Sequence, residues 1–209
     1  ESNDWYTSYD HPLGGNIGCT IGCTDIEASR KLYSDILGYD KVVYDVKGVQ
    51  EDWKNLPGGD REFRRVMLVR SNPSTGGFNK LAGKTHIELI QDLSDRPKTK
   101  MYEGRMWGDI GFVHLGFDVR NMKELGKTLD EAGFGFTCDT EDVLSMGERT
   151  KVHCTYIEDP DGTLIELIEV YKIPILEKLG INLNVEKRDP AKPLPDSLLK
   201  AMKFMRIKD

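Results

Sequence analysis

Several kinds of sequence signal are missing from this chain, and each absence excludes a class of protein. No apolar run approaches the roughly 20 residues that a membrane-spanning helix requires, so we expect no membrane partner. The formal net charge is −6, which gives no electrostatic reason to expect nucleic acid or an anionic membrane surface as a partner. No signal peptide is visible. We therefore expect a cytoplasmic protein, although the chain begins with Glu1 rather than Met, which is compatible with removal of an upstream segment.

Disulfide frameworks and covalent catalysis are also without support. The chain has only four cysteines, and none belongs to a Cys-x-x-Cys pair. Cys19 and Cys23 lie four residues apart on a predicted strand, hence about 13 Å apart, which is too far for a disulfide. No serine or cysteine lies in a nucleophile motif. The 209 residues are 38% hydrophobic and 31% charged, as in an ordinary globular protein with one sizeable core or two small modules.

The second half of the chain contains a strand, a helix and a hairpin. Residues 112–119, FVHLGFDV, alternate between apolar and other side chains, which predicts a half-buried strand. The next residues have apolar side chains at helical spacing, with Asn121 placed to cap a helix and Gly133 to end it. Residues 151–158 and 163–170 then predict two strands, joined through the tight-turn sequence Asp-Pro-Asp-Gly.

The first half repeats this order. Residues 16–23 alternate in the same way, and TDIEASRKLYSDILGY follows as a helix, capped by Thr24 or Asp25 and closed at Gly38. Further strands are predicted around KVVYDV, FRRVMLV and THIELIQ. The last strands of the two halves nearly repeat each other, HIELIQ against LIELIE. This pattern indicates an internal duplication.

Three segments carry a resemblance to a known family: TDIEASRKLYSDILGY, FVHLGFDVRNM and YIEDPDGTLIEL. They are similar to the vicinal oxygen chelate superfamily, which includes glyoxalase I, bleomycin-resistance proteins, methylmalonyl-CoA epimerase and extradiol dioxygenases. The resemblance covers about residues 14–171 and implies an α+β fold. In that fold two tandem βαβββ modules form a curved mixed sheet around a central cleft. A C-terminal helical extension follows here, because LPDSLLKAMKFM has apolar residues on one helical face and Asp196 or Ser197 in position to cap it.

The domain organisation follows from the duplication and the resemblance. The predicted segments are an N-terminal arm at 1–13, a first module at 14–95, a linker at 96–111, a second module at 112–171 and the extension at 172–209. A homodimer is compatible with this organisation, because modules of the family pair either within a chain or across subunits.

The resemblance also implies where a metal would bind. Family members take their ligands from the first and last strand of each module, which correspond here to Gly18, His114, Glu88 and Glu166. Gly18 has no side chain, so the first ligand is missing. Asn16 lies two residues earlier on the same strand face, about 6.6 Å away, and a shift or bulge would let it complete the coordination. The alternative is that Asn16 is a surface or turn residue.

The residues themselves are compatible with this placement. Glu88 and Glu166 each interrupt an apolar strand without any local cation in the sequence, and an unpaired charge buried among aliphatics is costly. Glu166 must therefore face water, a cation or a metal. His114, Glu88 and Glu166 around a divalent ion would suit Zn, Ni, Co, Mn or Fe. The alternative is a metal-free cleft in which His114 hydrogen-bonds Glu166.

Two further histidines are candidates for accessory contacts. His86 alternates with Glu88 and shares its strand face, so it is a candidate for contact with the substrate or with a ligand. His153 lies in the strand before the Asp-Pro-Asp-Gly turn. The arginines at 64, 65 and 149 could bind an anionic substrate tail, although an arginine on a strand face is usually just solvated.

Three functions follow as hypotheses. The first is a metal-dependent lyase or isomerase of glyoxalase type, in which the metal polarises a small carbonyl substrate toward an enediolate and Glu166, or else Glu88, moves the proton. The second is a metal-free small-molecule-binding protein like the bleomycin-resistance proteins. The third is an extradiol-type dioxygenase, which is disfavoured because Gly18 removes one of the two histidines that this chemistry requires.

Overall fold

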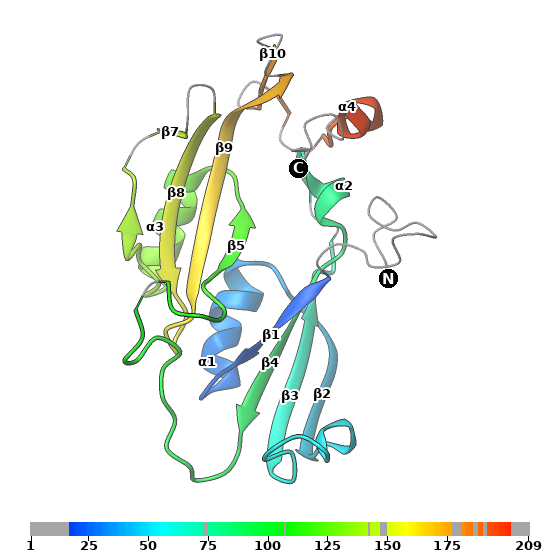
Figure 1. Ribbon diagram of the computed structural model, residues 1–209, viewed down its shortest axis with the longest axis vertical. Coiled ribbons are helices and arrows are strands. Elements are labelled where there is room, and N and C mark those ends of the chain that lie inside the picture. The colour runs from blue at the N-terminus through cyan, green and yellow to red at the C-terminus, as the bar shows by residue number, and fades with distance from the viewer. Residues whose placement is uncertain are drawn as a thin grey trace. The chain divides into compact units, whose positions relative to one another are not determined.

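The computed structural model describes residues 17–72, 75–106, 108–141, 143–146, 150–176, 181–185, 188–189 and 192–201 (Figure 1). The chain divides into two compact units, and neither is a continuous segment. Unit 1 consists of residues 1–73, 83–113 and 158–163. Unit 2 consists of residues 74–82, 114–157 and 164–209. The candidate residues Asn16 and Arg149 lie outside the described residues.

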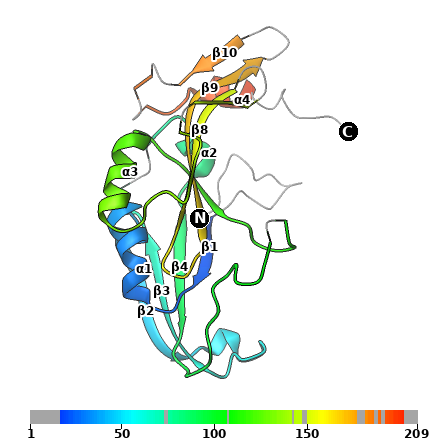
Figure 2. The same cartoon turned by 90° about the vertical axis from the view of Figure 1, so that its left-hand side faces the viewer.

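Unit 1 contains a four-stranded sheet in the order β1-β4-β3-β2, with β1 parallel to β4 and the other neighbours antiparallel. The strands are β1 (Gly18–Gly22), β2 (Lys41–Val49), β3 (Glu62–Val69) and β4 (His86–Asp92). The helix α1 (Ile26–Arg30) continues as a π-helical segment, Lys31–Ile36, and a 3-10 turn, Glu51–Trp53, follows β2. Figure 2 shows α1 on one face of this sheet.

The sequence signals for the ends of this helix are confirmed. The Asp25 carboxylate accepts hydrogen bonds from the Glu27 and Ala28 amides at 2.9 and 3.3 Å. Gly38 has φ +78°, a left-handed conformation that favours glycine after a helix. Between these ends the helix buries its apolar face on the sheet. The apolar side chains that are at most 2% exposed there come from both elements: Ile21, Ile26, Leu32, Tyr33, Val66, Leu68, Ile87 and Leu89.

One buried contact in unit 1 joins residues far apart in the sequence. The Tyr33 hydroxyl donates to the Asp159 carboxylate at 2.9 Å, and the two residues are 0% and 4% exposed. Asp159 begins the Asp-Pro-Asp-Gly turn, and its carboxylate also accepts from the Asp161 and Thr163 amides. The turn of the second predicted module therefore belongs to unit 1.

Unit 2 contains a sheet in the order β10-β9-β8-β6, with β5 parallel to β9 and β7 antiparallel to β8. Its strands are β5 (Leu115–Asp118), β6 (Cys138–Asp139), β7 (Leu144–Met146), β8 (Thr150–Glu158), β9 (Leu164–Leu176) and β10 (Ile181–Asn184). The helix α3 (Met122–Glu131) lies on one face of it (Figure 2). The two sheets, each with a parallel outer pairing and a helix on one face, confirm the α+β fold with two βαβββ modules.

The start of α3 differs from its prediction. Asn121 adopts a left-handed conformation with φ 55°, and its side chain makes no capping hydrogen bond. Instead the carboxylate of Glu169, on β9, accepts from the Asn121 and Met122 amides at 2.9 and 3.1 Å. Asn121 is thus the N-cap residue, as predicted, but a strand residue 47 or 48 positions later supplies the acceptor in place of its side chain.

The C-terminal extension packs within unit 2. Strand β10 pairs with the end of β9, and α4 (Asp196–Ala201) follows. Lys80 of α2 (Asn79–Ala82) pairs with Asp196 at 2.5 Å, while Leu194 and Leu199 are 0% and 5% exposed. The predicted helix is thus present; its expected apolar residues Met202 and Met205 lie outside the described residues. Among the described residues no helix is long and apolar enough to cross a membrane.

Candidate functional site

The Glu166 carboxylate is held by two side chains on one face of the unit 2 sheet. The Tyr156 hydroxyl donates to Oε1 at 2.8 Å, and His114 Nε2 lies 3.1 Å from Oε2. The His114 and Glu166 side chains are 30% and 18% exposed. Glu166 therefore lies on a partly open surface beside an imidazole. Its carboxylate is not an unpaired charge buried among aliphatic side chains.

The strand register explains why these residues meet. In the parallel pair β5–β9, Gly116 lies opposite Glu166, and His114 precedes Gly116 by two residues and so shares its face. Because residue 116 is a glycine, it places no side chain next to the Glu166 carboxylate; a Cβ there would lie 3.9 Å from Glu166 Oε2. The rings of His114 and Tyr156 pack edge to face at 5.6 Å.

Tyr156 and Cys154, which lie near Glu166, are held in their protonated forms. Burial, followed by the hydrogen bond to Glu166, raises the pKa of the Tyr156 hydroxyl. Burial and the charge of Glu166 also raise the pKa of the Cys154 thiol on the same face. Tyr156 thus remains a hydrogen-bond donor to the carboxylate at neutral pH, and Cys154 has no thiolate character.

Glu88, the corresponding residue of unit 1, has a different environment. Its Oε1 accepts from the Tyr44 hydroxyl at 2.5 Å and from Arg65 Nε at 2.7 Å, while Oε2 accepts from Thr20 at 3.1 Å. Arg65 also pairs with Asp52 at 2.8 Å. The sequence has no cation next to Glu88, but Arg65 reaches it from the neighbouring strand β3.

These contacts set the charge state of Glu88. Burial opposes ionisation of the carboxyl group, but hydrogen bonds from Tyr44 and Arg65 outweigh it, so the pKa of Glu88 is lowered. The guanidinium of Arg65 lies 4.3 Å from the ring centroid of Trp53. Arg65 is therefore not a solvated strand-face arginine but the centre of a polar network.

The position of the missing first ligand is filled by a neighbour. Gly18 on β1 pairs with His86 on β4. A Cβ at Gly18 would lie 2.7 and 2.6 Å from Cγ and Cδ2 of the His86 ring, and 2.3 Å from its carbonyl oxygen. No side chain fits there. His86 thus lies beside the predicted metal-ligand position, on the strand face of Glu88.

His153 does not join the His114–Glu166 pair. Its Nε2 lies 2.6 Å from an Asp139 oxygen. His153 shares its strand face with Thr155, two residues later, whose hydroxyl lies 3.6 Å from the sulfur of Met122 on α3. His153 therefore lies on the helix side of the sheet, whereas Tyr156 and Glu166 lie on the other side.

The residues fit a metal only in part. Within the described ranges no group of three or more histidine, cysteine, aspartate and glutamate side chains is arranged to hold an ion. In unit 2 an imidazole nitrogen and a carboxylate oxygen 3.1 Å apart fit two neighbouring ligand positions. Glu88 does not fit as a third ligand while Arg65, Tyr44 and Thr20 occupy its oxygens.

A comparison with protein-family models identifies the family of this chain. The model of the Glyoxalase/Bleomycin resistance protein/Dioxygenase superfamily matches residues 16–167. The chain belongs to this superfamily. Its two units thus represent the duplicated module of the glyoxalase superfamily, and the match spans both Glu88 and Glu166.

Solved structures with a similar fold include members of glyoxalase families. A glyoxalase family protein from Bacillus cereus is 16% identical, with a TM-score of 0.54, over 78% of this chain and 99% of that chain. A glyoxalase family protein from Enterococcus faecalis is 19% identical, with a TM-score of 0.49, over 74% and 97%. At such identities the likeness shows the fold alone. No curated protein matches the sequence of this chain at a significant level.

Proposed function

We propose that this member of the glyoxalase superfamily is a metal-dependent lyase or isomerase that acts on a small carbonyl substrate. The observation that supports the proposal is the His114–Glu166 pair, in which an imidazole nitrogen and a carboxylate oxygen lie 3.1 Å apart on a partly open sheet face. The Tyr156 hydroxyl holds the other oxygen of the same carboxylate.

Glu166 is the proposed proton carrier. A carboxylate on an open face can accept a proton from a carbon next to a carbonyl group and return it to the neighbouring carbon, which passes the substrate through an enediolate. Tyr156 orients Oε1 for this transfer and remains a donor, because the pKa of its hydroxyl is raised. His114 positions Oε2.

His114 and Glu166 are also the residues that would hold a divalent ion. When bound, Zn, Ni, Co, Mn or Fe would supply the Lewis acidity that stabilises negative charge on the substrate oxygens. Glu88 enters this proposal only as a reserve ligand and second proton carrier, because Arg65 would first have to release it.

A metal-free small-molecule-binding protein is the second candidate, and two observations favour it. The first-ligand position is Gly18, where the His86 ring leaves no room for a side chain. Glu88 is neutralised by Arg65. The same Gly18 position disfavours an extradiol-type dioxygenase.

Metal analysis with a substrate assay tests the proposal. The full chain, prepared separately with Zn, Ni, Co and Mn, is expected to retain about one ion per chain and to turn over the hemithioacetal of methylglyoxal and glutathione with at least one of them. His114→Gln should lower metal occupancy at least 10-fold, whereas the matched variant His153→Gln should leave it unchanged. Turnover with none of the four metals would contradict a glyoxalase activity. Full occupancy in His114→Gln would place the metal elsewhere.

The partner, the location and the assembly of the protein are proposed together with this function. We propose a small molecule as the partner, a cytoplasmic location and a homodimer as the assembly. Sedimentation of the purified chain measures the assembly, and a monomeric mass would exclude the dimer.

A further inference from the structure

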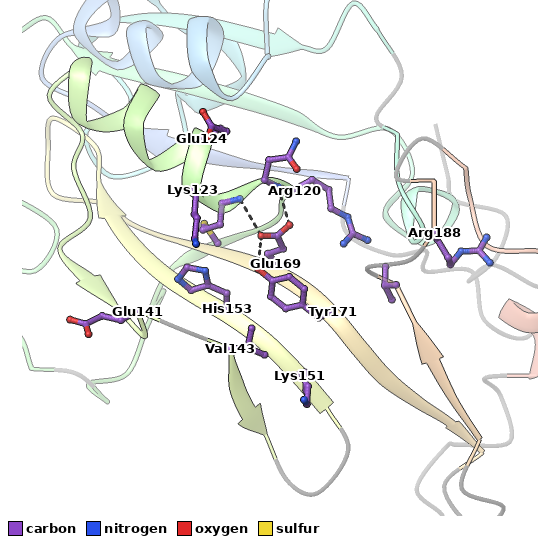
Figure 3. Close-up of a pocket in the computed structure, with 13 residues that line it drawn as sticks. Arg120, Lys123, Glu124, Glu141, Val143, Lys151, His153, Glu169, Tyr171 and Arg188 are labelled. Atoms are coloured by element: carbon purple, nitrogen blue, oxygen red, sulfur yellow. Dashed lines mark hydrogen bonds between the residues drawn. The ribbon is translucent and has the colours of Figure 1, made fainter.

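A cavity of about 1040 Å³ lies in unit 2, beside the start of α3 (Figure 3). Its walls come from the first turn of α3, from β8 and β9, and from the residues after β10. Ligand-binding cavities are usually about 300 to 1,000 Å³ in volume. The hollow is therefore large enough for a small molecule rather than a single ion.

The cavity is separate from the site proposed above. It is lined by His153 on β8 and by Glu169 and Tyr171 on β9. Along their strands these residues are an odd number of positions away from Tyr156 and Glu166. Since successive residues of a strand point to opposite faces, the cavity lies on the helix side of the sheet and Glu166 on the other.

Four cationic side chains from different segments line the cavity: Arg120, Lys123, Lys151 and Arg188. Among the described residues, none of the four has a carboxylate within ion-pair distance. Two of the four donate to backbone carbonyls, and Arg120 lies close enough to Asp118 for its charge to favour ionisation of that carboxyl group. Arg120 Nη1 donates to the Val170 carbonyl at 3.0 Å, and Arg188 Nη2 to the Pro193 carbonyl at 3.5 Å. On a chain with a net charge of −6, four cations gathered around one cavity favour the binding of an anion.

Three carboxylates also line the cavity, those of Glu124, Glu141 and Glu169, so the four cations exceed them by one. Glu169 accepts from the Asn121 and Met122 amides and, at 2.9 Å, from the Tyr171 hydroxyl (Figure 3). Glu124 pairs with Lys127 at 3.2 Å. Because Glu169 already occupies the positive end of α3, a bound anion would be recognised by the cationic side chains and not by the helix terminus.

The cavity also offers apolar surface. Met122 and Val185, which are 1% and 2% exposed, contribute to its walls together with the rings of His153 and Tyr171. A ligand that matches these walls has a compact apolar or ring-containing body and at least one negatively charged oxygen group.

We propose that this cavity binds a small molecule through its phosphate or carboxylate group, with Lys123 and Lys151 as the principal recognising residues. Phosphate and carboxylate share the chemistry that four cations recognise, which is a set of negatively charged oxygens accepting charge-assisted hydrogen bonds. This inference is independent of the reaction proposed at Glu166.

Calorimetric titration of the full chain with inorganic pyrophosphate and with citrate tests it. The expected result is saturable binding of at least one of them, at one per chain. Lys123→Gln and Lys151→Gln should each weaken that binding roughly 10-fold. Lys41→Gln removes the same charge from an exposed position in unit 1 and should leave the affinity unchanged.

The outcomes separate the two proposals and the two chemistries. Preference for pyrophosphate assigns the cavity to phosphate compounds, and preference for citrate to carboxylates. His114→Gln should leave anion binding unchanged, since His114 lies on the other sheet face. Binding of neither anion overturns the inference, as does an equal loss of affinity in Lys41→Gln and the two cavity variants.

Discussion

The two glutamates of the duplicated strands have nearly identical local sequences and different partners. Glu88, in HIELIQ, is fixed by Arg65, Tyr44 and Thr20. Glu166, in LIELIE, is held by Tyr156 and lies beside His114. Each carboxylate accepts a tyrosine hydroxyl, but one faces a permanent cation and the other a histidine.

The difference shows that the neighbouring strands, and not the strand itself, decide what a repeated carboxylate does. An arginine keeps its charge at every physiological pH, so Glu88 belongs to a fixed ion pair. Glu166 lies instead beside the His114 imidazole, and its side chain is more exposed than that of Glu88, at 18% against 8%. We infer that duplication left one copy with a structural role and the other with a chemical one.

The largest expected effect comes from comparing Glu166→Gln with Glu88→Gln. Removing a proton-carrying carboxylate costs about 10²- to 10⁴-fold in turnover, so we expect a loss of this size in hemithioacetal turnover for Glu166→Gln. Glu88→Gln should lower turnover by less than about 10-fold. Thermal unfolding of both variants is the control for folding. Equal losses of turnover in the two folded variants would contradict the inference that Glu166 has a chemical role and Glu88 a structural one.

A second comparison concerns the partners rather than the glutamates. Arg65→Met leaves the Glu88 carboxylate, whose side chain is only 8% exposed, without its cation. We expect a loss of about 3 kcal/mol in the free energy of unfolding, at the lower end of the range for broken buried ion pairs. His114→Gln should cost less than about 1 kcal/mol, since its pair with Glu166 is more exposed.

Urea unfolding measures both losses. Adding Glu88→Gln to Arg65→Met should recover part of the stability, because the buried negative charge is removed together with its partner. If the double variant is no more stable than Arg65→Met, the loss has another cause than the unpaired carboxylate.

The smallest expected effect is a difference in pH dependence. Because the pKa of Glu88 is lowered from its ordinary value of about 4.5, its ionised form stabilises the folded state. This stabilisation is fully present above about pH 4.5 and is lost as the pH falls through the lowered value. Glu88→Gln should therefore flatten the acid side of the curve of unfolding free energy against pH. Parallel curves for the two proteins would contradict the assignment.

Local patterns were sufficient to predict most of the fold. Strand alternation, the Asp25 cap, the Gly38 end and the Asp-Pro-Asp-Gly turn each depend on residues close together in the sequence, and each has a direct physical cause. The proximity of His114 and Glu166 could also be predicted. The two residues correspond to positions on the first and last strands of a module, and these strands lie side by side in the family fold.

The partners that determine the site could not be predicted in this way. Arg65 reaches Glu88 only because β3 pairs with β4 in a register that places Met67 opposite Glu88. Tyr44 follows an irregularity in the pairing of β2, which shifts its face. Glu169 caps a helix from a distant strand, and the cavity cations come from three separate segments. Single-strand periodicity contains no information on such contacts.

The hydrogen bond from Tyr33 to Asp159 has a consequence for the history of the chain. A duplicated gene begins as two equal halves, each able to be lost, copied or moved. Here the turn at 158–163 completes the core of the first half, and residues 74–82 belong with the second. Separating the halves would leave the Tyr33 hydroxyl without its acceptor in a fully buried position, a cost of about 1 to 3 kcal/mol. Each half is therefore expected to be less stable when expressed alone than within the full chain.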